Sequence, residues 1–334
     1  MNVNTKLQEA KLYSRINNKV VCRLCWHKCR IEDDKTGFCG ARVNFGGKLY
    51  TLTYANLSAI DSRPIEIKPF YHFKPASSSL TFSTYSCNLT CPWCQNWHLS
   101  KTMKEGYIIQ PEKLIQIALN NKDLSLCASF NEPTLLFEYL LDSFRLAKEH
   151  GLLNTMVSNG FMSLKALEML KNAGLDAMNI DIKGNDEVYE KYCGGKAKYV
   201  WKVVNKAIKL KLHVEVINLI ITDVNDSSDV IEEIIENHLK YAGCSVPLHF
   251  TRYFPAFLFN KPPTKIEILE KAIDMAKKEG VEYVYIGNVR SKFENTYCPR
   301  CRELLIRRHG YEVIDNKIKK GKCFNCGKEI YGVW

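Results

Sequence analysis

The 334-residue chain has no run of the roughly 20 consecutive apolar residues that a membrane-spanning helix needs. Its first residues, Met-Asn-Val-Asn-Thr-Lys, lack the charged-then-apolar pattern of a secretory signal. The sequence also lacks internal repeats and low-complexity segments, which excludes repeat architectures. We therefore expect a cytoplasmic globular protein without a transmembrane segment, with a core drawn from the 46% of residues that are hydrophobic.

Acidic residues are fewer than basic ones: 36 Asp and Glu stand against 47 Lys and Arg, which gives a formal net charge of +11. Such an excess would suit an anionic partner such as RNA or a phospholipid surface. The basic residues are spread along the chain, however, with only short runs such as 317–322. We favour a solvated lysine-rich surface, so nucleic acid is a candidate partner that the charge pattern does not favour.

The cysteines form three clusters, and the middle one lacks a fourth member. In a long cytoplasmic chain, clustered CxxC pairs indicate metal or cluster ligands rather than disulfides. The middle loop contains Cys87, Cys91 and Cys94. A [4Fe–4S] cluster usually takes four thiolates, so three would leave one iron free to bind a small molecule through an amine and a carboxylate. A zinc knuckle that takes its fourth ligand from elsewhere is the alternative, which we rank lower. Three cysteines stand apart from all clusters: Cys127, Cys193 and Cys244.

The two outer clusters have four cysteines each. The C-terminal set resembles zinc-ribbon spacing, and four thiolates around zinc would stabilise a short polar segment, with a rubredoxin-like iron site as the alternative. Its members are Cys298, Cys301, Cys323 and Cys326. The N-terminal set fits either zinc or an auxiliary [4Fe–4S] cluster; spacing does not separate these, and we favour structural zinc. Its members are Cys22, Cys25, Cys29 and Cys39.

Strand-like runs alternate with helix-like segments through the middle of the chain, which predicts a parallel sheet with right-handed crossovers. Expected strands cover 79–85, 124–130, 154–157, 177–182, 213–221, 248–253 and 281–286. Expected helices cover 111–120, 135–148, 164–172, 187–192, 200–210, 229–239 and 265–278. We expect an α/β fold in which 78–290 form a partial or full (β/α) barrel, with a doubly wound sheet as the rival. Residues 1–77 would form an N-terminal Cys-cluster region with short strands, and 291–334 a zinc-ribbon-like tail.

Polar side chains recur where successive expected strands end, and barrel enzymes place their chemistry at that rim. They are Asn131 and Glu132, then Ser158, Asn159 and Gly160, then Asp181 and Lys183, then Glu215 and Asn218, and lastly His249 and Arg252. Each alone would be an ordinary cap or turn residue. Their repetition in register predicts one binding site.

The chemistry of these residues suits a zwitterionic, sugar-bearing ligand such as S-adenosylmethionine (SAM). Glu132 can accept hydrogen bonds from an ammonium group, and Lys183 can pair with a carboxylate. Asp181 lies two residues before Lys183, so on a strand both side chains point to one face, where Asp181 would orient the lysine or contact the substrate. Cys193 is a candidate thiol hydrogen donor, with a packed loop cysteine as the alternative.

The three-cysteine loop resembles the radical SAM signature CxxxCxxC with an aromatic residue before its last cysteine, here Trp93. More closely, the chain resembles the pyruvate-formate-lyase-activating-enzyme-like branch, and within it the radical SAM member of the AmmeMemoRadiSam system. The segments that carry this resemblance extend over nearly the whole chain: Cys22-Arg-Leu-Cys25-Trp-His-Lys-Cys29, Gly37-Phe-Cys39, Pro69-Phe-Tyr-His-Phe73, Cys94-Gln-Asn-Trp97, Phe130-Asn-Glu-Pro-Thr134, Ala177-Met-Asn-Ile-Asp-Ile-Lys183, Tyr285-Ile-Gly-Asn288 and Asn295-Thr-Tyr-Cys298-Pro-Arg-Cys301.

The resemblance implies that the three loop cysteines ligate a [4Fe–4S] cluster. Phe-Asn-Glu stands here where the family has Gly-Gly-Glu, so only the role of Glu132, which is to hold the methionine amino group, carries over. Lys183 is then a candidate for the methionine carboxylate, and Ser158-Asn159-Gly160 replaces Thr-Asn-Gly while keeping the hydroxyl.

The implied activity is that of a radical SAM oxidoreductase. SAM would be cleaved reductively, and a 5′-deoxyadenosyl radical would take hydrogen from an unidentified substrate. A ferredoxin- or flavodoxin-like protein would supply the electron, and a Memo-like protein is a candidate partner. The alternatives are an activating enzyme that makes a glycyl radical on a protein partner, an RNA-modifying or RNA-binding metalloprotein, and an electron-transfer protein.

Overall fold

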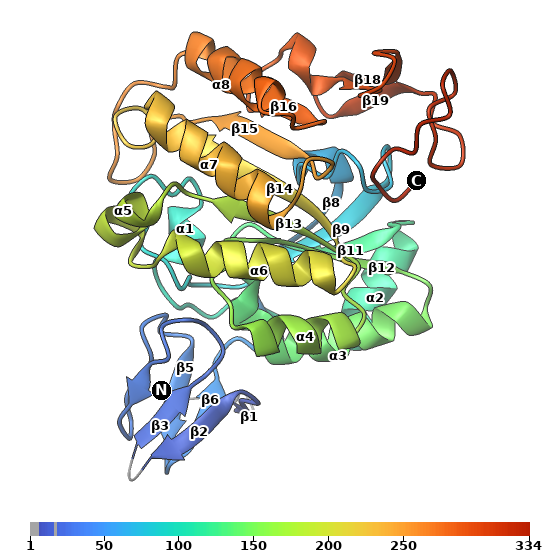
Figure 1. The fold of residues 1–334 in the computed structure, drawn as a ribbon. Helices are drawn as coiled ribbons and strands as arrows, with labels where there is room; N and C mark the ends of the chain where they lie inside the picture. Colours follow the sequence, from blue (N-terminus) through green and yellow to red (C-terminus); the bar gives the residue numbers. More distant parts are fainter. Residues whose placement is uncertain (1–6, 17–18) are drawn as a thin grey trace.

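The computed structural model describes residues 7–16 and 19–334, and its centre is an eight-stranded sheet (Figure 1). The strands are β8 (Ala59–Pro64), β9 (Ser78–Ser83), β11 (Ser125–Ala128), β12 (Leu153–Ser158), β13 (Ala177–Ile182), β14 (His213–Ile220), β15 (Leu248–Arg252) and β16 (Val284–Gly287). Neighbours from β9 to β16 pair in parallel, and β8 pairs antiparallel with β9. The predicted parallel sheet is confirmed.

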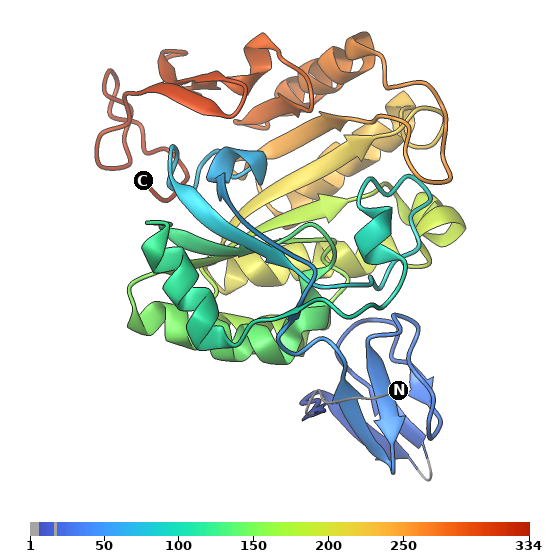
Figure 2. The ribbon, with the colours of Figure 1, turned by 180° about the vertical axis from the view of Figure 1, so that it is seen from behind.

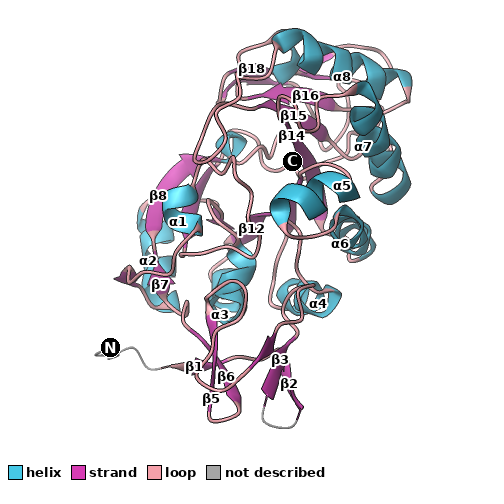
Figure 3. Ribbon diagram, turned by 90° about the vertical axis from the view of Figure 1, so that its left-hand side faces the viewer, coloured by secondary structure: helices cyan, strands magenta, loops and turns pink. Residues whose placement is uncertain are grey.

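Helices follow the strands and cover the outer side of the sheet, where Figure 3 shows α4, α6, α7 and α8 in a row. They are α1 (Trp97–Ser100), α2 (Pro111–Asn120), α3 (Phe137–Glu149), α4 (Leu164–Asn172), α5 (Asp186–Val188), α6 (Ala197–Lys209), α7 (Ser228–Tyr241) and α8 (Ile266–Lys278). Single turns complete the set at η1 (Ile65–Ile67), η2 (Pro133–Leu136), η3 (Tyr189–Cys193) and η4 (Lys292–Glu294). Ser163 begins α4 by accepting a hydrogen bond from the backbone N–H of Ala166 at 3.2 Å, as an N-cap residue does.

The strand order along the sheet is β16-β15-β14-β13-β12-β11-β9-β8, so the sheet is open. A full barrel would require its two edges, β16 and β8, to pair with each other. A doubly wound sheet would reverse its strand order at a switch point, whereas β9 to β16 follow the chain in sequence. The rival doubly wound fold is therefore wrong.

Two predicted boundaries move. We expected 1–77 to lie outside the barrel, but β8 is an edge strand of the main sheet. Its sequence, Ala-Ile-Asp-Ser-Arg-Pro, has two apolar residues followed by three polar ones, and none of the six is buried, as suits an edge strand that faces solvent. Residues 331–334, expected in a separate tail, pair with the segment between η1 and β9: the carbonyl of His72 accepts from Val333 N, and that of Val333 from Lys74 N, both at 2.7 Å. Lys74 Nζ also donates to Trp334 O at 2.7 Å.

Short sheets flank the main one on both sides (Figure 2). At the N-terminal side they contain β1 (Gln8–Glu9), β6 (Lys48–Thr51) and β5 (Arg42–Phe45), then β2 (Tyr13–Ile16), β3 (Lys19–Cys22) and β4 (Arg30–Ile31), and β7 (Asn56–Leu57) with β10 (Tyr107–Ile108). The C-terminal sheet contains β17 (Thr296–Tyr297), β18 (Leu304–His309) and β19 (Glu312–Asn316). No helix within 7–16 and 19–334 combines the length and the apolar character needed to cross a bilayer.

Candidate functional site

A cleft of about 390 Å³ opens at the carboxyl ends of the parallel strands. Its wall includes all three cysteines of the loop that follows β9, together with Glu132 and Asn159. Segments far apart in the chain meet here because parallel strands end at the same edge of a sheet. The predicted convergence of the loop with the rim residues is therefore present in the structure. Other predicted residues on the cleft wall are Asn131, Asp181, Lys183 and Arg252.

The three-cysteine loop presents its sulfur atoms with donors around them. Cys87 Sγ accepts from the backbone N–H of Leu89 at 3.4 Å and lies 3.7 Å from Asn159 Nδ2. Cys94 Sγ lies 3.1 Å from the hydroxyl of Ser100. Donors of this kind stabilise sulfur in its thiolate form, which is the form that binds iron.

Glu132 joins the ends of two neighbouring strands. Its Oε1 accepts from Thr134 N at 2.9 Å, from the Thr134 hydroxyl and from Ser158 Oγ at 2.9 Å. Its Oε2 accepts from Asn159 N at 2.8 Å. Burial raises the pKa of Glu132, although these hydrogen bonds act in the opposite direction. Oε2 takes a single donor from the described part of the chain, so it retains capacity for a second donor from the cleft.

Asp181 and Lys183 face the cleft together, as the alternation along β13 predicts. Lys183 Nζ lies 2.9 Å from Asp181 Oδ2. Burial lowers the pKa of Lys183, but the charge of Asp181 and the nearby sulfur of Cys91 outweigh it and hold the pKa above its usual value. The lysine is therefore a positive group, already oriented by a carboxylate.

Six predicted residues are not on the cleft wall, and two of them, Gly160 and Glu215, are buried. Asn218 points away because Ile217 and Leu219, its neighbours on β14, line the cleft; its Nδ2 donates to Ile182 O at 2.8 Å instead. The remaining three are Ser158, held by Glu132 beneath the surface; His249, 2.7 Å from Glu215 Oε2 in the layer below; and Cys193, buried with its Sγ 3.6 Å from that of Cys91. In these positions they support the site rather than line it, and the roles assigned to them from sequence remain predictions.

Sequence reasoning missed a buried cation on the cleft wall. Lys68 is 4% exposed, and its Nζ lies 4.0 Å from the centre of the Phe130 ring. No carboxylate lies within ion-pair distance of it among the described residues. Burial lowers its pKa. Lys68 lies between η1 and β9, directly before the motif Pro69-Phe-Tyr-His-Phe73 but outside it, and no helix or strand periodicity indicated it.

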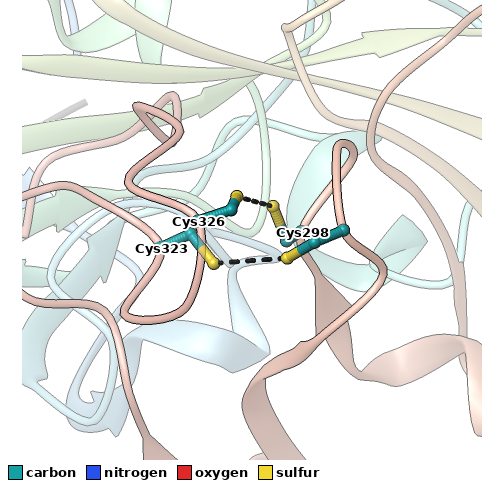
Figure 4. A group of neighbouring side chains, drawn as sticks. Cys298, Cys323 and Cys326 are labelled. Carbon is teal, nitrogen blue, oxygen red and sulfur yellow. Dashed lines mark hydrogen bonds between the residues drawn. The ribbon is translucent and has the colours of Figure 1, made fainter.

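The C-terminal cysteines form a compact group (Figure 4). The four sulfur atoms all lie within 4.8 Å of one another, with Cys298 and Cys326 at 3.6 Å and Cys301 and Cys323 also at 3.6 Å. Four thiolates about 2.3 Å from one zinc ion would lie about 3.8 Å apart, so these residues fit a single tetrahedral metal ion. The identity of that ion stays a prediction.

The comparisons with known proteins agree with this geometry. Residues 81–238 match the Radical SAM superfamily. The uncharacterized protein MJ0808 of Methanocaldococcus jannaschii is 37% identical over 332 residues, which cover 97% of this chain and 99% of that protein. A second protein of that organism, MJ1227, bears the name of a candidate glycyl-radical enzyme activating enzyme and is 26% identical over 47% of this chain and 67% of its own length. The chain belongs to the radical SAM superfamily.

A solved structure shares the fold. Streptococcus suis SuiB, bound to S-adenosylmethionine, superposes with a TM-score of 0.51 at 13% identity, over 63% of this chain and 50% of SuiB. The matched region thus spans half of SuiB. Membership of the superfamily implies SAM and a [4Fe–4S] cluster, and the chain fits them: three cysteines line the cleft, no fourth cysteine of the described residues does, and carboxylate and ammonium groups lie beside them.

Proposed function

We propose that the protein is a radical SAM enzyme that cleaves S-adenosylmethionine reductively and uses the resulting 5′-deoxyadenosyl radical to take hydrogen from a substrate. The observation that supports this most is the three-cysteine loop on a cleft that also presents Glu132 and Lys183. When bound, a [4Fe–4S] cluster supplies the electron that breaks the carbon–sulfur bond of SAM. That electron would come from a ferredoxin- or flavodoxin-like protein.

The chain's own residues would bind and orient the cosubstrate. Glu132 Oε2 has a free acceptor position for an ammonium group, and Lys183 is a fixed positive group for a carboxylate. Asn159 Nδ2 lies 3.7 Å from the sulfur of Cys87, so this side chain stands beside the loop cysteines on the cleft wall, within reach of a ligand bound there. Trp93, within the loop, is buried and packs against Tyr192 and Phe259, which fixes the loop against the rest of the protein.

The test is the formation of 5′-deoxyadenosine by anaerobically reconstituted protein with dithionite and SAM. Product is expected from the unchanged chain and from Cys244→Ala, a matched control because this cysteine is exposed and outside every cluster. No product is expected from the variant in which Cys87, Cys91 and Cys94 are all alanine. Full activity in that variant would exclude the loop as the reaction centre.

Two observations favour more specific assignments of the substrate. The motifs that match the AmmeMemoRadiSam system extend along nearly the whole chain, and the likeness to MJ1227 favours a glycyl-radical activating enzyme as the second candidate. The two differ in their target, because an activating enzyme leaves a radical on a protein backbone. Electron paramagnetic resonance after turnover with a Memo-like protein, or with a glycyl-radical enzyme, would distinguish them.

A further inference from the structure

The four N-terminal cysteines enclose a small cavity outside the cleft. Its wall contains all four sulfur-bearing residues together with Arg42. It has room for about one water-sized sphere at its centre. The remaining wall is largely apolar, from Leu24, Ile31 and Leu135. The cysteines are Cys22, Cys25, Cys29 and Cys39.

The spacing of these sulfurs differs from that of the C-terminal set. Among residues 7–16 and 19–334, only the C-terminal cysteines form a group of three or more ligands whose atoms all lie within 4.8 Å of one another. No three of the N-terminal sulfurs are therefore that close. Thiolates that share one zinc ion lie about 3.8 Å apart and leave no space between them. A cubane of four irons and four sulfides holds its thiolates farther apart, so the wider spacing of the N-terminal sulfurs fits the cubane better.

Arg42 supplies a second, independent observation. Its side chain is 1% exposed, and its Nη2 donates to both oxygens of Glu138, at 2.9 and 2.6 Å. Its Nε and Nη1 are buried, and no residue that the structure describes gives either of them a hydrogen-bond partner. Unpaired buried donors are costly and uncommon in native structures. Arg42 lies on the cavity wall, and a cluster with inorganic sulfide and thiolate sulfur would provide the missing acceptors.

Two contacts link this cavity to the three-cysteine loop. His27, two residues after Cys25, lies with its Nε2 2.7 Å from the carbonyl of Asn88, which directly follows Cys87. Cys39 accepts through its carbonyl a hydrogen bond from the hydroxyl of Ser86, which directly precedes Cys87. The two cysteine sets are thus neighbours through both residues that flank the first loop cysteine.

We propose that the N-terminal cysteines hold a second [4Fe–4S] cluster, fully ligated by protein and hydrogen-bonded by Arg42, beside the three-cysteine loop. This replaces the structural zinc that the sequence alone favoured. With four protein ligands the cluster has no open iron, so its chemistry is one-electron transfer rather than substrate binding.

The test removes the three cysteines of the loop and measures the iron, sulfide and zinc that each chain still binds. In the Cys87→Ala, Cys91→Ala, Cys94→Ala variant, reconstituted anaerobically with ferrous iron and sulfide, we expect four irons and four sulfides per chain and a reduced-cluster paramagnetic signal with dithionite. Zinc should be one ion per chain, at the C-terminal set. Two zinc ions without iron, one iron without sulfide, or no metal at the N-terminal set would each overturn the proposal.

Further variants of the same chain locate the cluster. Adding Cys22→Ala and Cys25→Ala should abolish the remaining iron, whereas adding Cys127→Ala, a buried cysteine outside all clusters, should leave it. Arg42→Lys keeps a positive charge beside Glu138 but loses N–H donors, so the midpoint potential of the remaining cluster should fall. An unchanged potential would contradict the role of Arg42. These measurements do not depend on SAM cleavage, because the loop variant cannot support it.

Discussion

Replacing Glu132 separates its structural role from its proposed binding role. Glu132→Ala leaves two backbone donors, Thr134 N and Asn159 N, buried without acceptors, because neither can turn toward water. Hydrogen bonds to a charged group contribute about 1.5–3 kcal/mol each, so the two losses amount to about 3–6 kcal/mol. Burial of the carboxylate is itself unfavourable, as its raised pKa indicates, which places the expected loss near 3 kcal/mol.

Glu132→Gln is the matched variant, since it keeps one carbonyl acceptor and the shape of the side chain. We expect it to lose about half as much free energy of unfolding, measured by urea denaturation followed by circular dichroism. It should nevertheless bind SAM at least about tenfold more weakly in anaerobic equilibrium dialysis, because the charge opposite the ammonium group is gone. A loss below about 1 kcal/mol for the alanine variant would refute the structural reasoning. Unchanged SAM affinity of the glutamine variant would remove Glu132 from the binding site.

Three further predictions concern stability. Lys68→Met should raise the free energy of unfolding by about 1 kcal/mol, since it removes an unpaired buried ammonium group. If that ammonium group binds an anionic ligand in the cleft, the same variant should also turn over substrate more slowly. Gly160→Ala should lower the free energy of unfolding by about 3 kcal/mol in thermal or urea unfolding, because φ is +67° and the new Cβ would lie 2.7 Å from a Val200 methyl. Its control, Gly243→Ala, has a φ of +93° but open space around the new Cβ, and should lower the free energy of unfolding by about 1–2 kcal/mol. Burial lowers the pKa of His238 to about 4, so between pH 6.5 and pH 4 the unfolded chain binds a proton at this group and the folded chain does not. The free energy of unfolding should therefore fall by about 3 kcal/mol from pH 6.5 to pH 4 through this group, and it should depend less steeply on pH in His238→Gln.

The regular part of the fold could be predicted because its signals are local. The expected strand 177–182 and the expected helices 111–120 and 164–172 coincide with β13, α2 and α4, where apolar periodicity and start residues agree. β8 was missed because an edge strand next to solvent needs no continuous apolar run.

The candidate site was predictable where a residue ends a buried strand, and less so elsewhere. Asn218 illustrates an available signal that was not used, since its alternation with Ile217 on β14 places the two on opposite faces. Lys68 and Arg42 could not have been found this way. Each lies on an irregular or short element that no periodic pattern marks. Each stands out only because its charged group is buried without a full set of partners, which is known only once the chain is folded.

The pairing of residues 331–334 with the segment before β9 has a consequence for biosynthesis. Val333 and Trp334 bond to His72 and Lys74, so two segments far apart in the chain complete one another. A ribosome releases a chain from its N-terminal side, and domains generally fold as they emerge. Here the sheet from β9 to β16 can form early, but the segment around His72 lacks these partners until residues 331–334 have left the exit tunnel. During that interval, the buried polar group formed by His72 and Glu215 lacks part of the packing that the finished chain provides.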